Sequence, residues 1–95
     1  MMNRERVKRV SADDAKRLRV ESQLVCTAIE GLVAAGMTVL AVSLMRRQPL
    51  IEVACSQRCG TLEAVTIRYG AQGVRRWKRK AALFCGCQVE WVEEV

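Results

Sequence analysis

The stretch "IEGLVAAGMTVLAVSL", residues 29–44, contains the change of pattern that decides the fold. Before Gly36, apolar residues recur every three or four positions from Leu18 onward, which predicts one amphipathic helix over residues 11–35. Ser11, with an acidic residue three positions later, is a helix-start signal, and Gly36 suits a helix end. After Gly36 the apolar residues alternate with others, as in a β-strand. The chain is therefore predicted to pass from helix to strand at Gly36.

The alternation continues into a predicted β-hairpin over residues 38–56. The segment "RRQP", residues 46–49, has the composition of a turn. Ile51, Val53 and Cys55 then fall on one face of the second strand. The helix and this hairpin together make the first half of the chain.

The second half is predicted to contain a short helix, an ambiguous basic element and a final strand. Apolar residues along one side favour a helix over residues 61–69, with a break at the glycines that follow. Residues 74–83 fit either a helix or a strand paired with the next segment. Residues 87–93 alternate like a half-buried strand. The predicted class is α+β: a helix on a small antiparallel sheet, ordered α-β-β-α-β, with a possible extra strand at 74–83.

Length and charge indicate one small basic domain. The chain has 95 residues and a formal charge of +6, which favours a polyanion or an acidic protein surface as partner. Seven of the 16 basic residues lie in residues 1–20 and five more in 75–80, whereas residues 90–95 are acidic. Residues 1–10 have no apolar period and are predicted to be a flexible basic arm before one domain at 11–95.

Five cysteines, an odd number, follow no cleavable secretory signal, which favours a reducing cytoplasm over a disulfide framework. Residues 24–45 are long enough and apolar enough to be considered as a membrane span. Glu30 near the middle would cost about 2.5–3.5 kcal/mol there, however, and the pattern changes at Gly36. We therefore prefer a soluble helix followed by a strand.

The segments "ACSQRCG" (54–60) and "FCGCQVEW" (84–91) each hold a close pair of cysteines, and two thiolate pairs can bind zinc. The spacings differ from the Cys-x₂-Cys of zinc ribbons, and no histidine is present. If residues 61–83 cross the domain, the pairs end up roughly 20 Å apart. Free thiols are the preferred interpretation, with Cys26 in the core. The ligands of the alternative zinc site are Cys55, Cys59, Cys85 and Cys87.

Catalysis is not expected. Without histidine there is no Cys-His or Ser-His pair and no imidazole for acid-base work at neutral pH. No Gly-rich phosphate-binding loop of the Walker type occurs. We expect neither an enzyme nor a small-molecule substrate.

Two binding functions fit the basic residues. The segment "RRWKRK", residues 75–80, offers phosphate contacts and one aromatic stacking surface for nucleic acid, unless it is a solvated face with Trp77 in the core. A basic face, an acidic C-terminus and an open sheet edge also suit an inhibitor or adaptor of another protein. The candidate binding residues are Arg46, Arg47, Arg75, Arg76, Trp77, Lys78, Arg79 and Lys80.

The layout of "IEGLVAAGMTVLAVSLMRRQPLIEVACS" (29–56) and a terminal "CQVEWVEEV" (87–95) resembles small accessory proteins encoded by bacteriophages and prophages. The resemblance implies a non-enzymatic protein that binds a host macromolecule, as anti-CRISPR and other anti-defence inhibitors do. Many such inhibitors are acidic and imitate DNA. The basic charge of this chain instead favours an acidic protein patch or the nucleic acid of a target complex.

We therefore expect a protein of the bacterial host cytoplasm, without cofactor, that binds and inhibits or modulates a host protein or nucleoprotein complex. The alternative is a zinc-ribbon-like module that binds nucleic acid.

Overall fold

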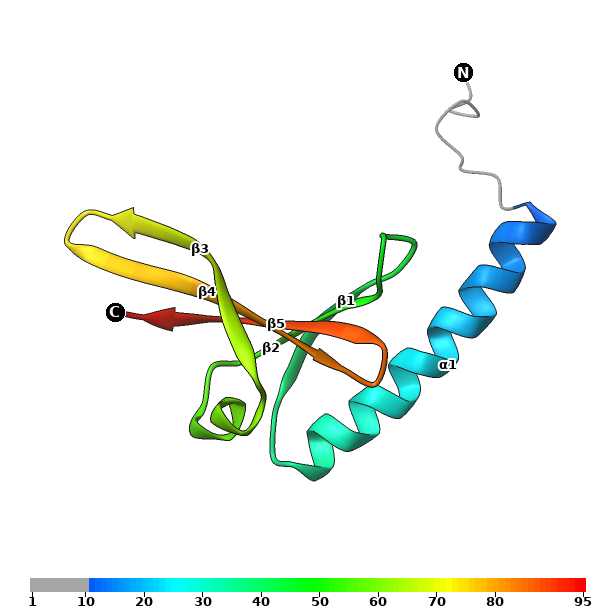
Figure 1. Ribbon diagram of the computed structural model, residues 1–95, viewed down its shortest axis with the longest axis horizontal. Coiled ribbons are helices and arrows are strands. Elements are labelled where there is room, and N and C mark those ends of the chain that lie inside the picture. The colour runs from blue at the N-terminus through cyan, green and yellow to red at the C-terminus, as the bar shows by residue number, and fades with distance from the viewer. Residues whose placement is uncertain (1–10) are drawn as a thin grey trace, which may run out of the picture.

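The computed structural model describes residues 11–95, which form one α-helix and a five-stranded sheet (Figure 1). This arrangement confirms the α+β class. The predicted arm at 1–10 lies outside the described residues. The elements are α1 (Ala12–Ala34), β1 (Val39–Ser43), β2 (Leu50–Val53), the 3₁₀ turn η2 (Gln57–Thr61), β3 (Ala64–Gln72), β4 (Arg75–Phe84) and β5 (Cys87–Glu94).

Helix α1 begins and ends where its sequence signals lie. The Ser11 hydroxyl accepts a hydrogen bond from the backbone N–H of Asp14 at 3.1 Å, and the Asp14 carboxylate accepts one from the N–H of Ser11 at 3.3 Å. This reciprocal capping box satisfies donors that have no partner within the helix. Gly36, just beyond the last turn, has a φ of 88°, a conformation that suits glycine. The predicted helix and the hairpin after it are both confirmed.

The strands lie in the order β1-β2-β5-β4-β3, and the sheet is mixed. Strands β1 and β2, β3 and β4, and β4 and β5 pair antiparallel, but β2 and β5 pair parallel. The prediction of an antiparallel sheet is therefore wrong at the centre. The reason is the connection after β2. The chain passes through η2 to β3 at the far edge of the sheet, then reverses into β4 and again into β5. Strand β5 therefore lies beside β2 and runs in the same direction.

Residues 61–69 do not form the predicted helix; most of them belong to strand β3. Three consecutive β-branched residues, Val65, Thr66 and Ile67, lose rotamer freedom in a helix and fit a pleated strand. Strand β4 supplies their pairing partner, which decides the ambiguity over residues 74–83 in favour of a strand. The chain turns at Gly73, with a φ of 63°, while Gly70 remains within β3.

The hydrophobic core lies between α1 and one face of the sheet. Val25, Ala28 and Leu32 of α1 are buried against it. Cys26 is exposed, contrary to the prediction, because it lies one position, about 100°, around the helix from Val25. The sheet, the 3₁₀ turn and the segment after α1 contribute the buried residues Met37, Ile51, Val53, Cys59, Ala82, Cys87, Val89 and Trp91.

Residues 24–45, considered above as a membrane span, are divided between the end of α1 and strand β1. Within residues 11–95, no helix combines the length and the apolar character that crossing a membrane requires. The β3–β4 hairpin extends away from α1, to the left in Figure 1, so part of the sheet projects beyond the helix.

Candidate binding surface on the open sheet face

The sheet has one face covered by α1 and one that no described helix covers. In β5, Cys87, Val89 and Trp91 point towards α1, and the residues between them point the other way. The pairing register shows which residues of the other strands lie on each face, because residues directly opposite each other on neighbouring strands share a face. We call the uncovered side the open face. It carries Leu50, Glu52, Val65, Arg68, Arg75, Trp77, Arg79, Ala81, Leu83, Gln88, Glu90, Val92 and Glu94.

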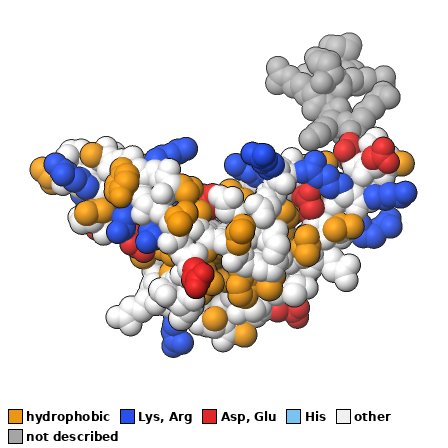
Figure 2. Space-filling model, in the orientation of Figure 1, with side chains coloured by type: hydrophobic (Ala, Val, Ile, Leu, Met, Phe, Trp, Pro, Cys, Tyr) orange, Lys and Arg blue, Asp and Glu red, His pale blue; other side chains and the backbone are white. Residues whose placement is uncertain are grey.

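The open face is concave and continuous. Four shallow hollows lie along it and share lining residues. Two of them are both lined by Arg46 and Leu50. A third shares Gln88 with one of these and Ile67 with the other, and the fourth shares Arg68 with one of the first two. Figure 2 shows the molecule hollowed between the projecting hairpin and the rest of the domain, with Lys and Arg side chains on both sides of the hollow. One end of the sheet therefore faces the other across this concavity.

Aliphatic side chains form one end of the open face. Val65 and Leu83 are 65% and 70% exposed, and Ile67, at the irregularity in β3, is 48% exposed. They line one hollow together with the small buried residue Ala81. Neighbouring apolar side chains exposed around a concavity are typical of interaction sites.

The centre of the open face is an internal ion-pair network. The Arg79 guanidinium contacts the Glu90 carboxylate of β5 and lies 3.4 Å from that of Glu52 in β2. The Gln88 amide also donates a hydrogen bond to Glu90. The hydrogen bond to Glu90 is the main cause that raises the pKa of Arg79, and Glu90 itself is buried. Through these contacts Arg79 links strands β4, β5 and β2. Because the two carboxylates compensate its charge, it is less available than an unpaired arginine to bind a partner.

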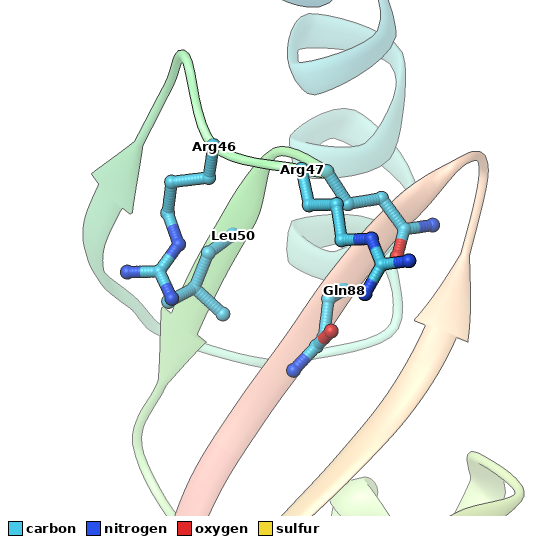
Figure 3. Close-up of a pocket in the computed structure, with 5 residues that line it drawn as sticks. Arg46, Arg47, Leu50 and Gln88 are labelled. Atoms are coloured by element: carbon cyan, nitrogen blue, oxygen red, sulfur yellow. The ribbon is translucent and has the colours of Figure 1, made fainter.

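Arg46 and Arg47 lie at the edge of the open face, in the loop between β1 and β2. The loop is attached to α1 by the buried Glu21, whose carboxylate accepts a hydrogen bond from the Met45 N–H at 2.9 Å. Arg17 bonds both to Glu21 and to the Arg46 carbonyl. Figure 3 shows the Arg46 and Arg47 side chains extending from this loop on the same side as Leu50 and Gln88.

The two loop arginines differ from Arg79. Both are exposed, and among residues 11–95 neither takes part in an ion pair. Their guanidinium groups line a hollow together with Gln48 and Gln88. A guanidinium without an internal carboxylate can form charge-assisted, bidentate hydrogen bonds to a carboxylate or phosphate of another molecule.

The predicted cluster at 75–80 is divided by strand alternation, although Arg75, Arg76, Trp77 and Arg79 line one hollow together with Arg68. Strand geometry places Arg75, Trp77 and Arg79 on the open face and directs the other three residues, Arg76, Lys78 and Lys80, to the opposite side. Lys78 lies 3.6 Å from the Glu93 carboxylate, and Arg75 lies 3.7 Å from that of Glu94. Trp77 is half-buried, with its indole ring over Gly70.

Arg68, Val65 and Leu83 are among the open-face residues that the sequence-based candidates did not include. The first two lie in the segment predicted as a helix, which hid their pairing with β4. The alternation in Val65-Thr66-Ile67 was the available signal, since β-branched residues are enriched in strands.

The four cysteines of the alternative zinc site lie at two ends of the sheet. Gln88 is aligned with Leu50 at the start of β2, so Cys87 lies at that end, whereas Cys55 and Cys59 follow the other end of β2. Within residues 11–95, no three Cys, Asp or Glu side chains are close enough to hold a metal ion. Desolvation is the first cause that raises the pKa of the buried Cys87 thiol and, although that side chain is exposed, of the Cys55 thiol, so both favour the protonated form at neutral pH.

Together, these features define a small α+β protein with a concave sheet face, aliphatic at one end and edged by arginine. A protein-family model described as the Kil protein family matches residues 18–92, which are 75 of the 95 residues. The chain therefore belongs to the Kil protein family, a phage-encoded family, and is a phage accessory protein. No curated protein and no solved structure matches the chain.

Proposed function

We propose that this Kil-family protein acts without catalysis, by binding a host protein or a protein complex through its open face and so inhibiting or modulating it. The observation that carries the proposal is the combination of exposed aliphatic residues with two arginines, Arg46 and Arg47, that form no ion pair with any carboxylate of residues 11–95. Arginine next to a desolvated apolar surface is characteristic of protein interfaces. An anti-defence target is the narrower form that the resemblance to phage inhibitors suggests; in a complex that contains nucleic acid, such as a CRISPR complex, the open face would contact the protein part.

A protein partner is favoured over nucleic acid by the distribution of charge. Phosphate recognition needs several free cations along one track. Here β4 divides its cations between two faces, and Arg75, Lys78 and Arg79 have glutamate partners on β5 or β2. Trp77 is packed on Gly70, which leaves at most one face of its indole ring for stacking on a base.

The absence of catalysis is supported by the residue chemistry. The chain has no histidine, and the raised pKa values of Cys55 and Cys87 leave little thiolate at neutral pH. Function would then depend on the affinity for a partner rather than on a reaction.

The test is affinity capture from a bacterial lysate with the tagged protein, with and without nuclease, followed by mass spectrometry. We expect a host protein to be captured by the wild type in both conditions and to be lost with Arg46→Glu/Arg47→Glu. The matched control is Lys16→Glu/Arg19→Glu, which reverses two exposed charges on α1 and changes the net charge equally. Capture that disappears with nuclease, or that both double variants reduce to the same extent, would contradict the proposal.

A further inference from the structure

The hydrogen bonds of the sheet restrict what can rest on the open face. Strands β2, β5 and β4 are interior strands, so most of their backbone N–H and C=O groups are already engaged; the exception is the end of β5 from Trp91 onward, which pairs with β4 but has no partner in β2. A segment lying across this face must satisfy its own backbone groups, and a helix does so within itself. An extended segment would need an edge, and each edge strand, β1 and β3, carries one register shift that interrupts regular pairing at that point.

The open face also has two chemically different ends. Val65, Ile67 and Leu83 expose aliphatic side chains at one end, and Arg46 and Arg47, which form no ion pair within residues 11–95, present their guanidinium groups at the other. Gln88 lines the hollows at both ends, so the two regions are continuous. A complementary segment therefore needs aliphatic side chains along one stripe and carboxylates beside it.

We propose that the open face binds an acidic amphipathic helix of the partner protein. Aliphatic residues at helical spacing would pack on Val65, Ile67 and Leu83, and carboxylates would pair with Arg46 and Arg47. This inference rests on the proposed function, since it names the kind of segment that the same face recognises. It excludes both strand addition at an edge and contact with nucleic acid as the main mode of binding.

Selection from a random peptide display library tests the inference without knowledge of the host target. The probe is a library of random peptides long enough for about four helical turns, displayed against the immobilised wild-type protein at about 0.15 M ionic strength. We expect enriched peptides to be acidic, with aliphatic residues at positions i, i+3, i+4 and i+7. A synthetic copy should gain helical circular dichroism when it binds.

Two variants locate the binding site. Arg46→Glu/Arg47→Glu and Leu83→Thr/Val65→Thr should each weaken binding of the enriched peptide tenfold or more, and Lys16→Glu/Arg19→Glu should change it less than threefold. The replaced side chains are exposed, and threonine keeps the β propensity, so the folded state should persist. Circular dichroism of the free variants checks this.

Several results would overturn the inference: no enriched sequence, enrichment of basic peptides, alternating aliphatic residues typical of a strand, or affinity that the open-face variants leave unchanged. Tighter binding of a labelled single-stranded oligonucleotide at the same face would also overturn it. The proposed function fails separately, when no host protein is captured from a lysate. If helical peptides bind but no host protein is captured, the preference for a helix stands and the proposed function is rejected. If a host protein is captured but no helical peptide is selected, the proposed function stands and the helix inference is rejected.

Discussion

Glu21 shows how one buried side chain positions the candidate site. It lies within α1, yet its carboxylate accepts hydrogen bonds from the Met45 N–H and from Arg17. Met45 has a φ of 61°, which is unfavourable for a side chain with a Cβ, so the loop conformation depends on such external bonds. The loop that carries Arg46 and Arg47 is therefore held by the helix.

We expect Glu21→Gln to destabilise the protein at neutral pH and less so in acid. The backbone hydrogen bond from Met45, followed by Arg17, lowers the pKa of Glu21 below its ordinary value. A lowered folded-state pKa means that the carboxylate contributes stability above the unfolded pKa and loses it as the pH falls through the folded one. Urea unfolding of both proteins over a pH series measures this. A difference in unfolding free energy that stays constant into acid would contradict the assignment.

Cys85 lies in a tight turn with a positive φ, a conformation that asparagine adopts more readily than cysteine. It has a φ of 52° and, with Gly86 at 79°, forms the two-residue turn between β4 and β5. Two successive residues with positive φ describe a type I′ turn, for which Asn-Gly is the preferred sequence.

Cys85→Asn should stabilise the protein by roughly 0.5–1 kcal/mol, because asparagine tolerates the left-handed conformation better than cysteine. The measurement is the free energy of unfolding in urea. Cys26→Asn is the matched control, since Cys26 is also exposed but lies in α1, where the two residues have similar helix propensity. Equal effects of the two substitutions would show that removal of a thiol, rather than turn geometry, is responsible.

The β3–β4 hairpin depends on the close contact between Gly70 and Trp77. A Cβ placed on Gly70 would lie 2.0 Å from Cζ2 of Trp77, so the indole ring fits only because the side chain is absent. The contact explains both why a glycine suits this position inside a strand and why Trp77 is half-buried without reaching the core.

Gly70→Ala should displace the indole ring of Trp77 into water. We expect fluorescence at longer wavelength, easier quenching by acrylamide and a loss of about 1–2 kcal/mol in unfolding free energy. Gly60→Ala is the control, because nothing lies within 4 Å of a Cβ placed there. An unchanged emission spectrum in Gly70→Ala would mean that Trp77 does not pack on Gly70 in solution.

The same hairpin marks the limit of prediction for individual elements. The bounds of α1 followed from Ser11 and Gly36, which are local signals. Strand β3 could not be predicted from local signals, because the apolar residues of 61–69 fit one side of a helix as well as a strand. Pairing with β4, which begins several residues later, decided between them.

Topology also decides the fate of the cysteines. Strands β3 and β4 come between β2 and β5 in the sequence, so β5 returns parallel to β2. Cys85 and Cys87 therefore lie near the start of β2, whereas Cys55 and Cys59 follow its end. We therefore expect the protein purified without added metal to contain less than stoichiometric zinc, and EDTA to leave its thermal unfolding midpoint unchanged. Elemental analysis and thermal unfolding monitored by circular dichroism test this. One bound zinc per chain, with a lower midpoint after chelation, would instead support the zinc-ribbon alternative.

The sequence by itself determined the α+β class, the bounds of α1, the first hairpin and the last strand, because each depends on residues close together in the chain. It also indicated that Arg46 and Arg47 lie at a hairpin tip. Only the tertiary structure decided which arginines of residues 11–95 form ion pairs, since Arg79 meets Glu52 and Glu90 across strands distant in sequence. The open face likewise required the parallel pairing of β2 with β5, a long-range contact that no local pattern encodes.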